Sequence, residues 1–266
     1  TMTELQGDAP LRRYIREPQA LQRAVDTWRG ASRHFLVQLG PDDVRSRVSA
    51  RLTAMSELER RYWSALPSTA IAERDSLSFL ALSLDTDGRP IGVANTDPAT
   101  RLFLDASDPA AAARLDASMP SELRDVRLFV RPYPVGLLID RVGPVVANDA
   151  YAPPSVWPVF EKDQYHGPKV VWGREVNLFL LGVSGFLAGN RSGPDAPELR
   201  DAVRRVKGAV EGAGFKSELW SYEIRNGRAM AVRYGTGSDV QLWSTSDLAV
   251  QFALDQLDHP SRAPRE

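Results

Sequence analysis

Apolar residues recur every three or four positions along much of the chain, which predicts a mainly helical protein. A first helix is expected between residues 11 and 40. A second should begin at Pro41, because proline and the acidic residues that follow it suit the first turn of a helix. Its apolar positions are Val44, Val48, Leu52, Met55, Leu58 and Tyr62. Charged residues fill its other face, so we expect an outer, half-exposed helix that ends near Pro67.

The second half of the chain alternates between two kinds of helix. Residues 170–188 are apolar on nearly every face, which predicts a buried inner helix. The next segment begins at Asp195 and is amphipathic, which predicts an outer helix, and residues 240–257 are again mostly apolar. This alternation, with polar and aromatic loops between the helices, predicts an α/α toroid, a ring of helical hairpins whose loops line a central pocket. We therefore expect residues 1–266 to form a single, mainly α domain.

Turn residues predict short β-hairpins and loops between these helices. The apolar run 79–84 is followed by a turn at residues 85–89, which predicts a small hairpin. Asn226-Gly227 predicts a second tight turn, and residues 98–115 should contain two short helices. Residues 139–168 form a long polar and aromatic connection. Long loops of this kind are usually functional, so we expect this one to cover or border the pocket.

Composition excludes several classes of function. The 266 residues carry 33 Lys and Arg against 34 Asp and Glu, so no long-range attraction draws the chain to nucleic acid or to an anionic membrane. There is no cysteine, which excludes disulfides, iron–sulfur clusters and Cys-ligated zinc. The three histidines are too far apart in the sequence to suggest a shared metal site. We expect no cofactor, no membrane span and a cytoplasmic location.

Residues 215–223 combine two carboxylates, Glu218 and Glu223, with the rings of Trp220 and Tyr222. Sugar rings stack on aromatic side chains, and cleavage of an acetal needs a positioned carboxyl group. The alternative is a strand at the protein surface, with glutamates toward solvent and aromatic rings toward the core. The stretch alone is compatible with both interpretations.

Three segments resemble the six-hairpin glycoside hydrolases. Tyr165, Gly167, Pro168, Trp172 and Asn177 resemble their Tyr-x-Gly-Pro-x-Trp…Asn segment. Phe215-x-x-Glu218-x-Trp220 is similar to their Phe-x-Glu-Tyr segment, and Gly237 to Ser244 resembles the opening of their last inner helix. This group contains trehalases, processing α-glucosidase I, and the glucosylglycerate and mannosylglycerate hydrolases. A looser likeness extends back to about Leu21.

The resemblance implies an inverting hydrolase for an α-linked glucoside or mannoside, with Glu218 as the general base that activates water. It also implies a carbohydrate-binding site around Glu218. Its walls would be Trp172, Trp220 and Trp243; its hydrogen-bonding residues would be Asn177 and Gln241; and Tyr165, His166 and Asp149 would complete it. On composition alone, Trp172 and Trp243 would more often be core residues.

The general acid of that family would fall at or before residue 1 of this chain. We expect residues preceding Thr1, or a second copy of the chain in a homodimer, to close the ring and supply the acid. Asp149 and Asp163 are the substitutes within the long loop.

Two alternatives remain open. A toroid without its acid would be a non-catalytic carbohydrate-binding domain, or a subunit completed by another chain. A toroid epimerase or polysaccharide lyase would use a Tyr/His pair such as Tyr165-His166. A carboxylate about 6.5–9.5 Å across the pocket from Glu218 would favour the inverting hydrolase.

Overall fold

The computed structural model describes residues 14, 16–107, 120–163, 165–189, 192–215, 217–235 and 246–258. Within them the protein is mainly α-helical, with ten helices and short antiparallel strands. The mainly α prediction is therefore confirmed, whereas a closed ring of helical hairpins stays a prediction. Among the described residues, no helix combines the length and the hydrophobicity that a membrane span requires.

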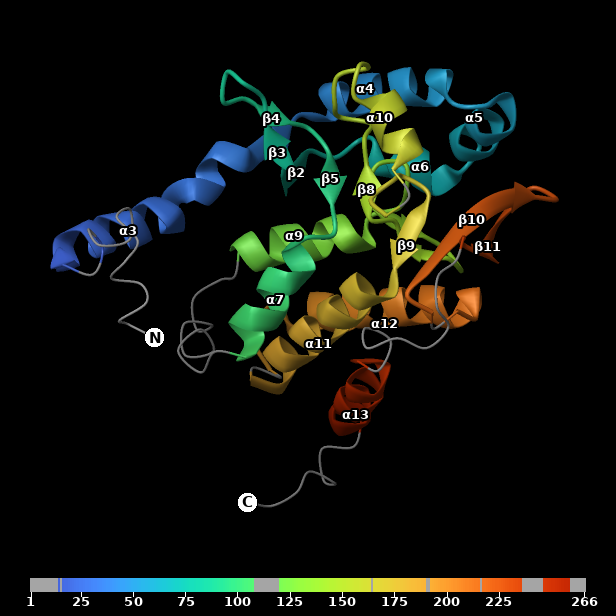
Figure 1. Cartoon of the computed structure of the whole chain (residues 1–266). Helices are drawn as coiled ribbons and strands as arrows, with labels where there is room; N and C mark the ends of the chain where they lie inside the picture. The colour runs from blue at the N-terminus through green and yellow to red at the C-terminus, as the bar shows by residue number, and fades with distance from the viewer. Residues whose placement is uncertain are drawn as a thin grey trace.

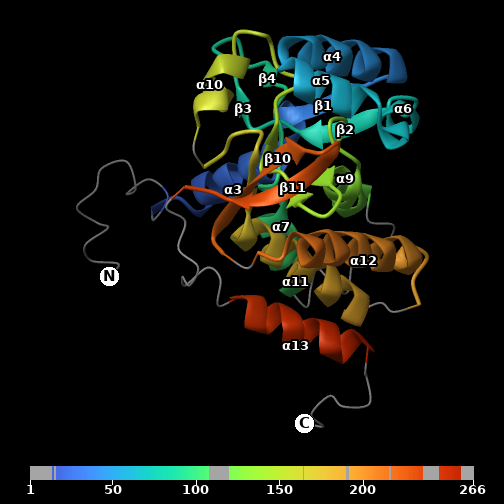
Figure 2. The same ribbon diagram turned by 90° about the vertical axis from the view of Figure 1, so that its right-hand side faces the viewer.

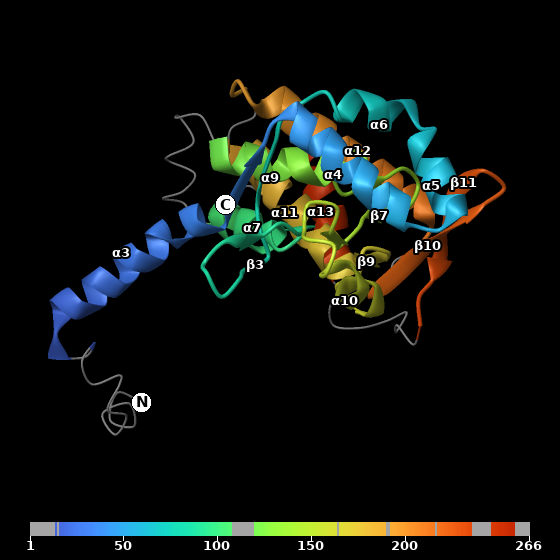
Figure 3. The same ribbon diagram turned by 90° about the horizontal axis from the view of Figure 1, so that it is seen from above.

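Residues 16–91 form four helices and four short strands. They are α3 (Pro18–Phe35), β1 (Leu36–Leu39), α4 (Pro41–Ala54), α5 (Glu57–Ser64), α6 (Pro67–Ala72), β2 (Leu77–Leu80), β3 (Ser83–Leu84) and β4 (Pro90–Ile91). Strand β1 pairs antiparallel with β2, and β3 pairs with β4 across the turn predicted at residues 85–89. Helix α3 projects from the rest of the molecule (Figures 1 and 3), with the side chain of Trp28 81% exposed.

The middle of the chain is built of short elements around two helices. They are β5 (Ala94–Asn95), α7 (Pro98–Ser107), α9 (Pro120–Val130), β6 (Leu138–Ile139), β7 (Gly143–Pro144), β8 (Ala147–Asn148) and α10 (Trp157–Lys162). The connection 139–168 is therefore less irregular than predicted, since it contains β7, β8 and α10. Strand β8 pairs with β5, which fixes the loop to the first half of the chain.

The last part of the chain carries the longest strands and three helices. They are β9 (Val170–Trp172), α11 (Gly173–Gly189), α12 (Ala196–Ala213), β10 (Leu219–Arg225), β11 (Arg228–Arg233) and α13 (Ser246–Asp258). Strand β10 lies between β11 and β9 in an antiparallel sheet. Figure 2 shows α4, α5 and α6 at one end of the molecule, α13 at the other, and the β10–β11 hairpin between them.

Three predicted helices differ from the structure at their boundaries. The helix expected between residues 11 and 40 ends at Phe35, because residues 36–39 pair with β2 as strand β1. The helix expected from Pro41 to Pro67 is divided, because Ser56 accepts a hydrogen bond from the backbone N–H of Glu59 and begins α5 as its N-cap. The buried helix expected over 170–188 begins only at Gly173. Residues 170–172 instead form β9, whose β-branched valines pair with β10. The segments 108–119 and 236–245, which carry parts of two predicted helices, lie outside the described residues.

The main hydrophobic core joins both halves of the chain. Val44, Val48 and Leu52 of α4 are buried as the apolar pattern predicted. The indole of Trp63 contacts the rings of Tyr133 and Tyr222 edge-on, at centroid distances of 4.8 and 5.7 Å. Helices α7 and α11 approach closely at Gly182, where an added Cβ would lie 2.7 Å from the backbone of Leu102. Glycine at this position therefore permits the contact between the two helices.

Candidate functional site

The expected site residues fall into separate regions of the structure. Tyr165, His166 and Trp172 lie together around β9, whereas Asn177 and Trp220 line a pocket between helices. Asp149 is buried in an ion pair elsewhere. Trp243 and Gln241 lie outside the described residues. The structure thus brings together only part of the expected set.

The first region, the Trp172 cluster, consists of Tyr165, His166, Trp172, Arg174 and Glu175. The ring of His166 lies 6.4 Å from that of Tyr165 and 6.0 Å from that of Trp172, and the guanidinium of Arg174 lies 5.7 Å from the Trp172 ring. Tyr165 is 53% exposed. Aromatic rings near solvent beside a cation form a surface on which a flat polar ligand can stack.

Asp163 fixes the loop that presents Tyr165 and His166. Its Oδ1 accepts hydrogen bonds of 2.8 Å from the backbone N–H groups of both residues. Although partial burial raises the pKa of Asp163, these bonds and the nearby His166 hold it below its ordinary value. Asp163 therefore stays ionised and acts as a turn-forming residue, which does not favour it as the substitute general acid.

Glu175, in the first turn of α11, is a buried carboxyl group. Glu175 is 3% exposed, and its Oε1 forms an ion pair with Arg174. Among the described residues its Oε2 has no hydrogen-bond partner. Burial raises the pKa of Glu175 to about 7, and the negative charge of Asp97 adds to the rise, while Arg174 opposes it. Glu175 therefore changes its charge near neutral pH.

The titration of Glu175 predicts a pH-dependent stability. A folded-state pKa of about 7, above the ordinary 4.5, means that the stabilisation is complete below pH 4.5 and is lost as pH rises through 7. The free energy of unfolding should thus decrease by about 3 kcal/mol across this range because of Glu175. Urea unfolding at a series of pH values gives the free energy of unfolding of the wild type and of Glu175→Gln, and the difference between the two pH profiles is the contribution of Glu175. Parallel profiles would contradict a raised pKa.

The second region is a cavity of about 340 Å³, here called the interhelical pocket. It is lined by Gly173, Val176, Asn177 and Leu180 of α11, Lys207, Val210 and Glu211 of α12, Gly214, Phe215, Ser217 and Trp220 around the start of β10, and Asp247, Val250, Gln251 and Leu254 of α13. Its volume lies at the lower end of the range of about 300–1,000 Å³ for small-molecule pockets. Apolar walls with a few polar groups are typical of such sites.

Local contacts fix the walls of the interhelical pocket. Asn177 donates a 2.7 Å hydrogen bond to Oγ of Ser246, which links the first turns of α11 and α13. The indole of Trp220 is 1% exposed; it donates to the carbonyl of Val142 and stacks at 6.5 Å on the ring of Phe215. Trp220 is thus a core residue that also forms part of a pocket wall.

Glu218 lies beside this pocket but is not one of its lining residues. It is half-buried at the start of β10, and its backbone carbonyl accepts a 2.8 Å hydrogen bond from the N–H of Gly173. This bond holds the backbone of Glu218 against Gly173, the first residue of α11.

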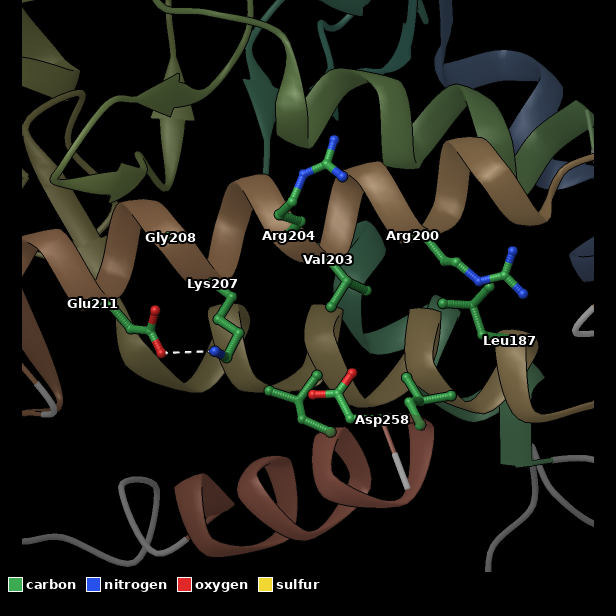
Figure 4. Close-up of a pocket in the computed structure, with 10 residues that line it drawn as sticks. Leu187, Arg200, Val203, Arg204, Lys207, Gly208, Glu211 and Asp258 are labelled. Atoms are coloured by element: carbon green, nitrogen blue, oxygen red, sulfur yellow. Dashed lines mark ion pairs between the residues drawn. The ribbon is translucent and has the colours of Figure 1, made fainter. Parts of the chain in front are cut away.

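A groove between α12 and α13 continues from the interhelical pocket. It has a volume of about 460 Å³ and shares Lys207, Glu211 and Leu254 with the pocket. Figure 4 shows Lys207 and Glu211 as neighbours on α12, joined by an ion pair of 2.9 Å, with Asp258 on α13 opposite. A ligand longer than the interhelical pocket therefore has a path along these two helices.

The third region is a cavity of about 480 Å³ near the other end of the molecule, here called the polar pocket. Its charged and hydroxyl-bearing lining residues are Arg51, Ser56, Glu59, Tyr133, Glu161, Asp163, Lys169, Ser221, Tyr222 and Tyr234. The loop 148–168 contributes Glu161, Asp163, Gly167 and Pro168. The long loop thus borders a pocket, but not the one beside Glu218 that it was expected to cover.

Asp149 lies behind the polar pocket in a buried ion pair with Arg51. Nε of Arg51 donates to Oδ1 of Asp149 at 2.7 Å, and Nη2 donates to Oδ2 at 3.2 Å. The side chains are 3% and 1% exposed, and Arg51 also contacts Glu161 at 3.0 Å. A carboxylate occupied in this way holds the fold together and is poorly placed to donate a proton to a substrate.

Three residues that were not singled out from the sequence belong to recognisable patterns. Arg51 follows Val44 and Val48 at helical spacing, so an arginine stands on the apolar stripe of α4. Ser56 and Glu59 form the Ser-x-x-Glu pattern of a capping box. The described residues contain no group of three or more His, Asp or Glu side chains placed to hold a metal ion.

Comparisons with protein-family models, with curated proteins and with solved structures find no match for this chain. Its function is therefore argued from the site itself.

Proposed function

We propose that the chain is a carbohydrate-active enzyme, an inverting glycosidase that cleaves an α-linked glucoside or mannoside on a ring of helical hairpins. The sugar would bind in the interhelical pocket. One observation carries the proposal: two of the segments that resemble six-hairpin hydrolases meet at this pocket, although they are about 40 residues apart in the sequence. The first contributes Asn177 and the second contributes Phe215 and Trp220. The helix that follows the third segment, α13, forms the opposite wall.

The chemistry of the pocket fits a sugar. Phe215 and Trp220 supply an apolar wall for the C–H face of a pyranose, and Asn177, Ser217 and Gln251 supply hydrogen-bonding groups for its hydroxyls. In this proposal Glu218 is the general base that activates water. Asp247 of α13 lines the pocket from another element, and we assign it as the carboxyl to test as general acid.

Blocking the pocket tests the proposal. The wild type, incubated with a panel of α-glucosides and α-mannosides, should release sugar with inversion at the anomeric carbon, which NMR of the fresh product detects. Gln251→Trp should abolish this activity, because Gln251 is an exposed lining residue and an indole there fills the opening. Leu248→Trp on the same helix is the matched control, since Leu248 is 75% exposed and does not line the pocket. No hydrolysis across the panel would contradict an enzymatic role.

A non-catalytic carbohydrate-binding domain is the second candidate. It is favoured by the environments of Asp149 and Asp163, because both of the expected substitute acids are occupied by structural contacts. In that case the panel would show sugar binding without cleavage.

A further inference from the structure

Helix α3 has an apolar stripe that no other described part of the chain covers. Leu21, Ala24, Trp28 and Ala31 follow one another at steps of three and four residues, so they lie along one side of the helix. Leu21 is 50% exposed and Trp28 is 81% exposed. The helix projects from the rest of the molecule (Figures 1 and 3), and no other described element packs along its length. Since helices in proteins are stabilised mainly by packing of their apolar side, this stripe lacks a covering surface.

The charged side chains of α3 lie away from this stripe. Arg23, Asp26 and Arg33 are exposed, and helical spacing places them on the side opposite to Leu21 and Trp28. Two copies of the helix can therefore meet along the stripe without bringing like charges together. The net charge of the whole chain is -1, so two copies do not repel each other strongly at long range.

The alternation of large and small residues favours a second copy of the helix as the covering surface. Ala24 and Ala31 let two helices approach closely, and the indole of Trp28 can fill the space above an alanine of the facing helix. Steps of three and four residues are also the spacing of helices that wind around each other along a common seam. A membrane-binding helix, by contrast, buries bulky side chains along its apolar side, whereas the bulky residues here are separated by alanines.

We propose that α3 is a dimerisation helix that pairs antiparallel, across a two-fold axis, with α3 of a second copy of this chain. Trp28 of each copy packs over Ala24 of the other copy, and Leu21 packs over Ala31. The helix joins the body of the protein at its C-terminal end, so an antiparallel pair places the two bodies at opposite ends (Figure 1). A contact between two helices of this length is small, so the dimer should be weak, with a dissociation constant in the micromolar range. No lining residue of the interhelical pocket belongs to α3, and the proposal does not depend on hydrolysis.

Sedimentation equilibrium of the full chain across the micromolar range tests the pairing. The average mass should rise with concentration from 29.4 kDa towards twice that value. Trp28→Glu should raise the dissociation constant about tenfold or more, because it removes the indole and places a charge on the stripe. Gln19→Glu is the matched control, since it makes the same change of charge at an exposed position on the opposite side of α3, and it should dimerise as the wild type does. A urea unfolding curve for each variant verifies that the fold is kept.

Ala24→Trp distinguishes this pairing from general hydrophobic association. A second indole at position 24 would collide with Trp28 of the other copy, so it should weaken the dimer although it adds apolar surface. The proposal is overturned if the wild type stays monomeric, if Trp28→Glu dimerises as tightly as Gln19→Glu, or if Ala24→Trp strengthens the dimer. It is also overturned if the monomer binds vesicles of phosphatidylcholine and phosphatidylglycerol and loses that binding in Trp28→Glu, because α3 would then be a membrane-binding helix.

Discussion

Replacing Glu218 with glutamine should reduce glycoside hydrolysis by about 10²–10⁴-fold, because the amide keeps the shape of the side chain but cannot take a proton from water. Glu218 is half-buried at the start of β10, and its carbonyl is bonded to Gly173, so the exchange of one oxygen for an amide nitrogen should leave the fold intact. The measurement is the initial rate on the best substrate of the panel, together with a urea unfolding curve for each variant.

Glu223→Gln is the matched control for this experiment. Glu223 lies on β10, five residues after Glu218; its side chain is 51% exposed, and its partner is Arg225 at 2.7 Å. Replacing the carboxylate of Glu223 by an amide should leave the hydrolysis rate unchanged. Full activity in Glu218→Gln would remove Glu218 from the catalytic role. An equal loss in both variants would instead indicate that the strand, and not the base, had been disturbed.

Local sequence patterns were enough to predict much of the helical structure. The stripe of α4 predicted the burial of Val44, Val48 and Leu52, because one face of an amphipathic helix has to be covered. Asn226-Gly227 predicted the turn between β10 and β11, where both residues adopt positive φ. Such features depend on neighbours within a few residues, so they can be recognised from the sequence alone.

Short strands were harder to predict than helices. Strand β9 has three residues, and it exists because Val171 pairs with Trp220 across nearly 50 positions of sequence. Nothing within the segment 170–188 marks where the strand ends and the helix begins, except Gly173. By contrast, the strand that was the alternative interpretation of residues 215–223 is present as β10, with Trp220 and Tyr222 buried and Glu223 exposed.

Candidate site residues depended on contacts that the sequence does not specify. The resemblance placed Asn177 and Trp220 in one site, and they line the same pocket. Asp149, proposed as a sugar ligand or acid, is instead the partner of Arg51, which lies 98 residues earlier. An aspartate in a polar loop has the same local pattern in both roles, and only the folded chain brings the arginine to it.

Removing the carboxylate of Asp149 should destabilise the protein by about 3–5 kcal/mol, because it leaves the guanidinium of Arg51 buried without its main counter-charge. Both side chains are almost fully buried, and Glu161 at 3.0 Å is half-exposed and a weaker substitute. That loss is a large share of the roughly 5–15 kcal/mol that holds a typical domain folded. Urea unfolding of Asp149→Asn, which keeps the volume of the side chain, measures it.

Glu161→Gln is the control for that measurement, since it removes the other partner of Arg51. Because the side chain of Glu161 is 52% exposed, its ion pair with Arg51 should contribute less than about 1 kcal/mol to the free energy of unfolding. The double variant Arg51→Met with Asp149→Leu should recover most of the stability lost in Asp149→Asn, because no charge is then buried alone. If Asp149→Asn and Glu161→Gln lower the free energy of unfolding by the same small amount, the buried pair does not hold the loop at residues 148–168 to α4. If the double variant is no more stable than Asp149→Asn, the loss comes from packing and not from the unpaired charge.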